Sequence, residues 1–311
     1  MPFDLGVFAS GLIQTMPQYP IVGGGVIVDA NGYRHHIFTA TTTFQIIRGA
    51  PDPTRRFDML VVAGGGGSGP GAGTTVTGAG GAGGLFSTTS WALSNGVYAV
   101  TVGGGGAVGS NGNPSSFGAI SIPGGGRGGN QGSPVGGAGQ AGGSGGGGGS
   151  PGVYMNAGSV GGLATGSPAE GVAGTYGNPG SGSFTFNWTF GGGGGGSGDW
   201  AMGPKSGPYT TQGGSGGTGT YFAKYVGLPF GDPVYPGHYA SGGSALSDSG
   251  FNWNRSPQRK PGGGGSVYDG RGWPGTGGGG GGAPGGSPTG SLNLNTGTGG
   301  GGVIILSYLF P

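Results

Sequence analysis

Residues 191–198 read Gly-Gly-Gly-Gly-Gly-Gly-Ser-Gly, and this run limits the folds that the chain can adopt. Glycine loses more backbone entropy on folding than any other residue, so such a run weakens both helices and ordinary strands. Similar runs recur without a fixed spacing, which argues against a solenoid of equal repeats. The other runs are residues 64–69, 103–106, 124–129, 142–149, 213–219, 262–265, 277–282 and 299–302.

Polyproline-II geometry offers these runs a way to pack. It has three residues per turn, a rise of about 3.1 Å per residue and no internal hydrogen bonds, so its amides are free to bond to neighbouring helices. Polyglycine helices lack side chains and can approach closely enough for N–H···O bonds and Cα–H···O contacts between them. A helix inside such a bundle must be small on all three faces, whereas one at its surface can carry a side chain at every third position. A single run is more often a flexible linker, but the number of runs and the scarcity of charge favour packing.

The composition points to an unusual folded chain. The 311 residues include 94 Gly and 23 Pro, a level typical of disordered or collagen-like chains. A strict Gly-X-Y period is missing, which excludes collagen. Only 6% of the residues are charged and 10% are aromatic, whereas disordered chains are usually rich in charge and poor in aromatic residues.

Charge and cysteine content exclude several classes of function. The formal net charge is +2, which gives no electrostatic reason to expect binding to nucleic acid or to an anionic membrane. The chain has no cysteine, so disulfides and thiolate metal sites are excluded. The longest apolar run, residues 303–310, is too short to span a membrane. No Lys or Arg precedes Arg34, so a secretory signal with a positive first region is not expected.

Segments with strand-like patterns lie between the glycine runs. Residues 36–47 are rich in β-branched and aromatic residues, and residues 57–63 read as a buried strand that leads straight into a glycine run. Further strands are expected at 85–93, at 97–102 with its period-two alternation, and at 303–310. No segment has a convincing amphipathic helical pattern. We therefore expect a mainly β fold in which β-sandwich-like strands are combined with a bundle of packed polyglycine-II helices and essentially no α-helix.

These patterns divide the chain into four parts. Residues 1–32 form an N-terminal attachment segment, for which a first strand of the same domain is the alternative. Residues 33–123 form a β-rich base, residues 124–302 a polyglycine-II bundle with variable aromatic loops, and residues 303–311 a closing C-terminal strand.

An ordered set of strand motifs leads into the glycine runs. The motifs are Ile37-Phe-Thr-Ala-Thr-Thr-Thr-Phe44, Leu60-Val-Val-Ala-Gly-Gly-Gly-Gly67, Gly81-Ala-Gly-Gly-Leu-Phe86, Tyr98-Ala-Val-Thr-Val-Gly-Gly-Gly-Gly106, Asn111-Gly-Asn-Pro-Ser-Ser-Phe-Gly118 and Gly299-Gly-Gly-Gly-Val-Ile-Ile-Leu-Ser-Tyr308. This set resembles the glycine-rich domain of phage tail and tail-fibre proteins. The later part, in which glycine runs alternate with variable loops, is similar to the tail-fibre tip adhesins of T-even-like phages. In those adhesins, polyglycine-II helices stack and the variable loops bind the host receptor.

The resemblance implies a non-enzymatic adhesin of a phage tail fibre or tail tip that needs no cofactor. Its implied partners are other tail proteins, bound through the N-terminal segment, and a protein or polysaccharide on the outer surface of the host. Such a protein is made in the host cytoplasm without a signal peptide and ends in the virion. Monomer and homotrimer both stay open. Two alternatives remain: a purely structural spacer of the phage tail or virion, and a glycine-rich cell-surface or ice-binding protein.

Aromatic residues in the loops between the runs are the candidate receptor contacts. Tyr and Trp give a large, rigid contact area with a polar handle and dominate binding hot spots. The alternative is that these side chains pack against one another or cap the ends of a glycine slab. One arginine of this region is a candidate for acidic sugars or phosphates. The candidates are Trp188, Trp200, Tyr221, Phe222, Tyr225, Tyr235, His238, Tyr239, Trp253, Arg255, Tyr268 and Trp273.

Catalysis finds little support in the sequence. The residues available for a pair of acids are Asp199, Asp232, Asp248 and Asp269. Any loop-rich protein offers such residues, so they do not indicate a glycoside hydrolase. His35 and His36 are adjacent, and because neighbours in a strand point to opposite faces, they cannot easily chelate one metal together. We expect no catalytic, cofactor or metal site.

Overall fold

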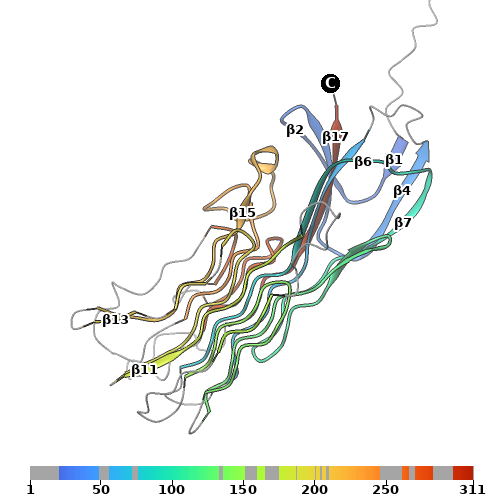
Figure 1. Cartoon of the computed structure of the whole chain (residues 1–311). Helices are drawn as coiled ribbons and strands as arrows, with labels where there is room; N and C mark the ends of the chain where they lie inside the picture. Colours follow the sequence, from blue (N-terminus) through green and yellow to red (C-terminus); the bar gives the residue numbers. More distant parts are fainter. Residues whose placement is uncertain are drawn as a thin grey trace, which may run out of the picture.

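The computed structural model describes residues 21–48, 56–71, 76–132, 136–150, 160–164, 175–186, 188–199, 201–203, 205–207, 210–245, 261–265, 270–282 and 297–310. The molecule is elongated (Figure 1). The strands of two sheets lie near the C-terminal end of the chain, and the glycine runs extend away from them side by side. Two hairpins stand near the far end, β11–β12 (Phe184–Phe186 and Trp188–Phe190) and β13–β14 (Lys205–Gly207 and Thr210–Gln212).

Two antiparallel sheets make up the β-rich end. The five-stranded sheet has the order β1 (Ile21–Gly23), β4 (Thr42–Arg48), β7 (Gly96–Thr101), β8 (Ser115–Phe117) and β9 (Ile120–Ile122). The six-stranded sheet has the order β10 (Thr175–Tyr176), β6 (Leu85–Trp91), β5 (Phe57–Val62), β17 (Val303–Leu309), β3 (Tyr33–Phe38) and β2 (Val26–Ala30).

The two sheets face each other across an aromatic core. Phe44 of the five-stranded sheet meets Phe38 and Phe57 of the six-stranded sheet edge to face, with ring centroids 6.0 Å apart in both pairs. Met59, Leu306 and other buried apolar residues of both sheets belong to the same cluster. Two antiparallel sheets with one buried face each form a sandwich of this kind.

The six-stranded sheet is also covered on its second face. Leu60 and Ile305 point to this face and belong to a second buried cluster together with Tyr225, Leu228 and Tyr239 from a long loop. Burial on both faces explains why β5 and β17 read as continuous apolar runs rather than alternating ones.

The expectation of a mainly β chain is confirmed. The strands expected at 57–63 and 303–310 are present as β5 and β17, and the only helix among the described residues is one 3-10 turn, η1 (Ala223–Tyr225). The β-rich stretch 36–47 is two strands rather than one. It bends at residues 39–41, and this bend places β3 and β4 in different sheets.

The described part of the N-terminal segment belongs to the sheets. β1 pairs with β4, and β2 pairs with β3 through a tight turn at Asn31 and Gly32, whose φ angles are 54° and 77°. Asn-Gly at such a turn is a strong hairpin signal. The alternative of a first strand in the same domain thus describes residues 21–32, and residues 1–20 lie outside the described part. The segment 303–311 contributes a central strand rather than an edge, because β17 lies between β3 and β5.

Backbone hydrogen bonds join the glycine runs to one another with a period of three. The N–H groups of residues 64 to 69 donate in turn to the carbonyl oxygens of Asn113, Gly300, Gly81, Ser110, Gly297 and Gly78, at 2.6–3.1 Å. Those of residues 78 to 84 donate in turn to Gly129, Gly192, Gly280, Gly126, Gly195, Gly277 and Pro123, at 2.8–3.0 Å. Residues three apart therefore donate to the same neighbouring segment, and the N–H groups of each of these two runs reach three segments.

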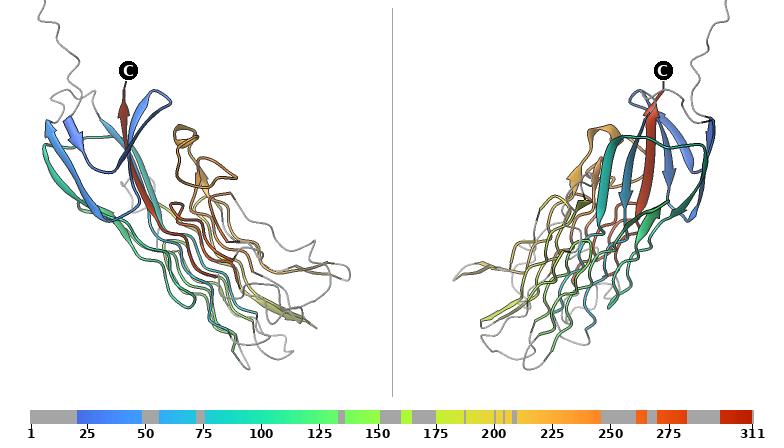
Figure 2. Two further views of the ribbon diagram at one scale, coloured as in Figure 1. Left: turned by 180° about the vertical axis from the view of Figure 1, so that it is seen from behind. Right: turned by 45° about the vertical axis from the view of Figure 1, so that its right-hand side comes forward.

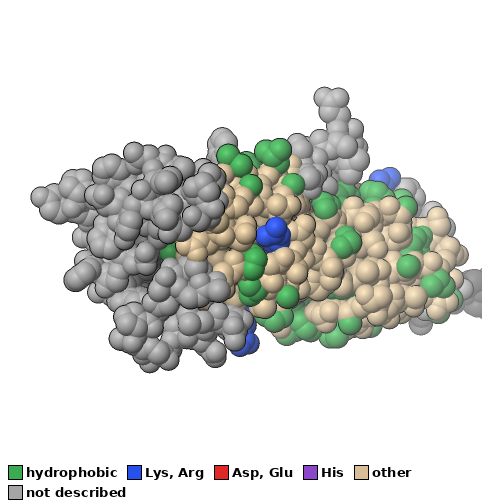
Figure 3. All heavy atoms as spheres, turned by 90° about the horizontal axis from the view of Figure 1, so that it is seen from below, with side chains coloured by type: hydrophobic (Ala, Val, Ile, Leu, Met, Phe, Trp, Pro, Cys, Tyr) green, Lys and Arg blue, Asp and Glu red, His purple; other side chains and the backbone are tan. Residues whose placement is uncertain are grey.

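The runs lie too close together for side chains between them. A Cβ added to Gly66 would stand 2.2 Å from the carbonyl oxygen of Gly126, and one added to Gly80 would stand 2.0 Å from that of Gly66. On the face in Figure 3, most of the described surface is backbone and side chains that are neither charged nor hydrophobic, hydrophobic side chains are scattered over it, and the few Lys and Arg side chains stand apart from one another. The interior of this part of the molecule is made of backbone.

Candidate functional site

One long loop stands out from the glycine runs beside the six-stranded sheet (Figure 2). We call residues 220–239 the 220-loop. It begins and ends in a short antiparallel ladder, β15 (Thr220–Tyr221) with β16 (His238–Tyr239), and η1 lies within it. It carries six of the twelve candidate contact residues: Tyr221, Phe222, Tyr225, Tyr235, His238 and Tyr239.

The inner side of the 220-loop is packed on the sheet. Tyr225 and Tyr239 are 4% and 0% exposed, and their rings meet edge to face at 6.3 Å. Phe222 lies against both rings, and Tyr225 also meets the ring of His35 from β3 at 5.9 Å. Burial raises the pKa of both tyrosine hydroxyls, so they stay protonated. For Tyr225 and Tyr239 the packing alternative applies, and neither side chain is available to a partner in this structure.

Polar contacts hold the 220-loop to β5 and to the β2–β3 hairpin. Lys224 forms an ion pair with Asp58 of β5, and its Nζ lies 4.2 Å from the centroid of the Tyr33 ring. The side-chain Nδ2 of Asn31 donates to the carbonyl oxygens of Lys224 and Val226, both at 3.1 Å. The turn residue that closes the hairpin therefore also positions the loop.

The carboxylate of Asp232 ties the loop to the glycine runs. Its Oδ1 accepts hydrogen bonds from the N–H groups of Val234 (2.9 Å) and Tyr235 (3.1 Å), and its Oδ2 accepts from Gly262 (3.2 Å) and Gly263 (2.9 Å). The residue is 2% exposed. A buried carboxylate that accepts several N–H donors is a structural anchor. Asp232 therefore has a structural role in this loop.

Three aromatic side chains remain at the outer side of the 220-loop. Tyr221 is 54% exposed, and its ring lies 4.8 Å from that of His238. Tyr235 is half-buried and meets His238 edge to face at 6.4 Å. The backbone beneath these rings is anchored at several points, so the structure holds them at the outer side of the loop.

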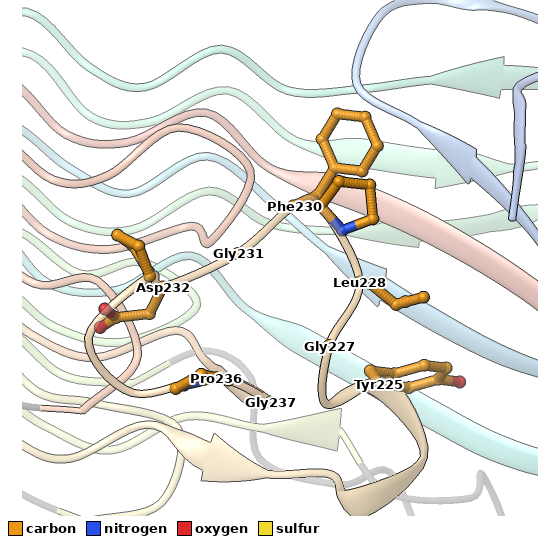
Figure 4. A pocket seen from close by; sticks show the side chains of 10 residues that line it. Tyr225, Gly227, Leu228, Phe230, Gly231, Asp232, Pro236 and Gly237 are labelled. Carbon is orange, nitrogen blue, oxygen red and sulfur yellow. The ribbon is translucent and has the colours of Figure 1, made fainter. Parts of the chain in front are cut away.

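A pocket of about 270 Å³ lies within the 220-loop (Figure 4). The backbone from Gly227 to Gly237 curves around it, while Tyr225, Leu228 and Asp232 point away from its centre. Gly227, Gly231 and Gly237 have φ angles of 83°, 107° and 79°, which let the chain curve in this way.

A second pocket lies beside residues 270–277, which we call the 270-turn. Its volume is about 310 Å³, and Arg271, Trp273, Pro274 and residues 298–301 line it. The two parts of the site are connected, because the Trp273 N–H donates to the carbonyl oxygen of Gly263 at 2.8 Å and the Gly263 N–H donates to Asp232. The half-buried Trp273 is thus the one candidate outside the 220-loop whose side chain the structure describes.

The other candidates cannot be placed in this site. Trp188 lies in the hairpin β11–β12, and the surroundings of its side chain are not described. Outside the described residues lie Trp200, Trp253, Arg255 and Tyr268, and also Asp248 and Asp269.

Sequence reasoning missed Arg271 and the anchors of the loop. Arg271 stands two residues before Trp273 in the printed sequence, and this pairing was the available signal. The bonds from Asn31 to the 220-loop and from Asp232 Oδ2 to the glycine run carried no local signal, since their partners are far away in sequence.

The two adjacent histidines face opposite sides of β3. His35 Nδ1 lies 2.8 Å from the hydroxyl of Ser307, and His36 Nδ1 lies 2.8 Å from the carbonyl oxygen of Gly24. Within the described ranges, no group of three or more His, Asp or Glu residues is arranged to hold a metal ion. No helix in the same ranges has the length and apolar character needed to cross a membrane.

Comparison with models of known protein families gives no match, and neither does comparison with curated protein sequences.

Proposed function

We propose that this chain is an adhesin of a phage tail fibre or tail tip, in which a rigid bundle of polyglycine-II helices and a β-sandwich together hold the 220-loop out to the host surface. The proposal has a structural part and a functional part, and different observations support them.

The hydrogen-bond pattern of the glycine runs supports the polyglycine-II bundle. Polyproline-II geometry has three residues per turn, so successive N–H groups point in three directions and repeat at every third residue. Residues 64–69 and 78–84 follow this period. The exposed Gly104 and Ala107 stand three apart at the edge of one run, as a surface helix would require.

The anchoring of the 220-loop is the observation that carries the functional part. Loops on rigid scaffolds are where binding residues concentrate. Here an ion pair, the Asn31 and Asp232 hydrogen bonds and a buried apolar cluster fix the loop, while Tyr221, Tyr235 and His238 remain at its outer side. A fixed backbone lowers the entropy that a partner must overcome on binding.

The test is binding of the purified chain to intact cells from a panel of bacteria. We expect the double variant Tyr221→Ala/Tyr235→Ala to bind at least about tenfold more weakly than the wild type, because aromatic hot-spot residues cost more than about 1.4 kcal/mol on truncation. The matched control is Val97→Ala, which truncates a 64% exposed side chain on β7 of the other sheet. Point variants are preferred to deletion, since removing the loop would expose the apolar face of the six-stranded sheet.

Two outcomes would count against the proposal. Unchanged binding by the folded double variant would remove the 220-loop from the contact surface. A folded wild type that binds no cell type, yet assembles into phage particles, would favour the structural spacer.

A further inference from the structure

We propose that the pocket beside the 270-turn binds an acidic sugar, meaning a sugar ring that carries a carboxylate or a phosphate. This inference rests on the proposed adhesin function and names a ligand class for a second part of its surface. The pocket offers a positive charge, an aromatic side chain and a glycine floor.

The charge comes from Arg271. Its side chain is exposed, lines the pocket, and forms no ion pair within the described ranges. A guanidinium presents donors in a planar fork that matches the oxygens of a carboxylate or a phosphate. By contrast, the basic residue of the 220-loop, Lys224, is already paired with Asp58, and the acid of that loop, Asp232, is occupied by backbone donors. The anion-binding group of the two pockets is therefore Arg271.

The aromatic surface comes from Trp273. This residue is half-buried, and its backbone is fixed on both sides: the N–H donates to Gly263, and the carbonyl oxygen accepts from the Thr276 hydroxyl at 2.7 Å. An indole on a fixed backbone offers a flat apolar face beside a polar group, which suits the C–H face of a sugar ring. Pockets for small ligands combine such apolar walls with a few placed polar groups.

The floor of the pocket is a glycine run that has room at one position. A Cβ on Gly300 would stand 2.1 Å from the carbonyl oxygen of Trp273, so this residue is packed. A Cβ on its neighbour Gly301 would meet one atom, the carbonyl oxygen of Gly103, at 4.0 Å. Gly301 lines the pocket, which takes about 310 Å³. We therefore expect a side chain at position 301 to narrow the pocket at its wall without disturbing the backbone contacts.

The experiment is titration of the full chain with four probes. Isothermal calorimetry and saturation-transfer NMR measure the binding of each probe. The probes are glucuronic acid, N-acetylneuraminic acid, glucose 6-phosphate and the neutral control glucose. We expect at least one acidic probe to bind at least about tenfold more tightly than glucose, and more weakly as salt is raised. Binding of the carboxylate probes alone or of the phosphate probe alone identifies the anionic group.

Two variants and a matched control locate the site. Arg271→Gln is expected to reduce affinity for the acidic probes at least about tenfold and to leave glucose unchanged. Gly301→Val is expected to abolish binding of all probes. The control is Gly104→Val, which adds the same side chain to another glycine run where the nearest atom is the Asn113 Nδ2 at 3.6 Å, and it should bind like the wild type. Unfolding midpoints establish that each variant is folded.

The proposal is overturned if glucose binds as tightly as the acidic probes, or if acidic probes still bind after Arg271→Gln or Gly301→Val. These failures are distinct from failure of the adhesin function. If the chain binds no acidic sugar but Tyr221→Ala/Tyr235→Ala still loses cell binding, the adhesin function is supported and sugar binding by this pocket is contradicted. If the chain binds acidic sugars but binds no cells, the sugar-binding pocket is supported and the adhesin function is contradicted.

Discussion

At the scale of single residues, the packing of the glycine runs depends on the absence of side chains. Neighbouring positions in one run differ sharply in the space around them. A Cβ on Gly105 would stand 1.9 Å from the carbonyl oxygen of Gly299, whereas one on Gly104 would have the Asn113 Nδ2 at 3.6 Å as its nearest atom. The obstacle at Gly105 is backbone that is itself hydrogen bonded, so it cannot yield as a side chain would.

We therefore expect opposite results from alanine at these two positions. Gly105→Ala should lower the free energy of unfolding by about 3 kcal/mol, the upper part of the usual range for overpacking. Gly104→Ala should be neutral or raise it by up to about 1 kcal/mol, since alanine restricts the unfolded chain. Urea unfolding of the pair measures both values. Equal stability of the two variants would contradict the close packing of the runs.

At the scale of elements, the strands could be predicted from the sequence and their partners could not. β5 and β17 are recognisable because residues 57–62 and 303–309 are apolar and β-branched. The assignment of β3 and β4 to different sheets depends on a bend at residues 39–41, which contains no Gly or Pro to mark it.

The same limit applies to the candidate site. The aromatic loop was recognisable as a candidate from its composition, and Tyr221 lies at its outer side. The inward position of Tyr239 depends on a sheet face made by distant segments, so nothing local separates it from Tyr221. Arg271 required knowledge of the pocket that the runs on either side create.

The strand β3 carries a pH-dependent element of stability. His35 and His36 are both buried, and burial lowers the pKa of each imidazole below its ordinary value of 6.5. The nearby Arg34 guanidinium acts in the same direction on the pKa of His36. The unfolded chain therefore binds protons before the folded chain does as the pH falls below 6.5.

Stability should be constant at pH values above the ordinary histidine pKa and should fall once the pH drops below it. Each histidine contributes at most about 1.4 kcal/mol per pH unit until its folded-state pKa is reached. Urea unfolding between about pH 8 and pH 5 measures this slope, and the variant His35→Gln/His36→Gln should flatten it. A slope that persists in the double variant would assign the pH dependence to other groups.

At the scale of the whole molecule, two kinds of interior are joined end to end. The sandwich excludes water with Phe, Leu, Ile and Val side chains, as most domains do. The glycine part excludes water with paired amides and carries hardly any apolar side chain between its runs. The 220-loop lies where these two parts meet, held by the apolar face of the sheet on one side and by Gly262 and Gly263 on the other.

This construction predicts an unusual heat capacity of unfolding. Exposing apolar surface raises the heat capacity and exposing polar surface lowers it, and ordinary domains gain about 12–15 cal/mol/K per residue. Unfolding of the glycine part exposes mainly peptide groups, so the value for the whole chain should lie clearly below about 12 cal/mol/K per residue. Urea acts on peptide groups as well as on apolar surface, so the dependence of unfolding free energy on urea should stay near that of other chains of this size. Differential scanning calorimetry combined with urea titration measures both quantities. An ordinary heat capacity would mean that the glycine runs bury apolar surface instead of backbone, and it would contradict the packing from which the rigidity of the site follows.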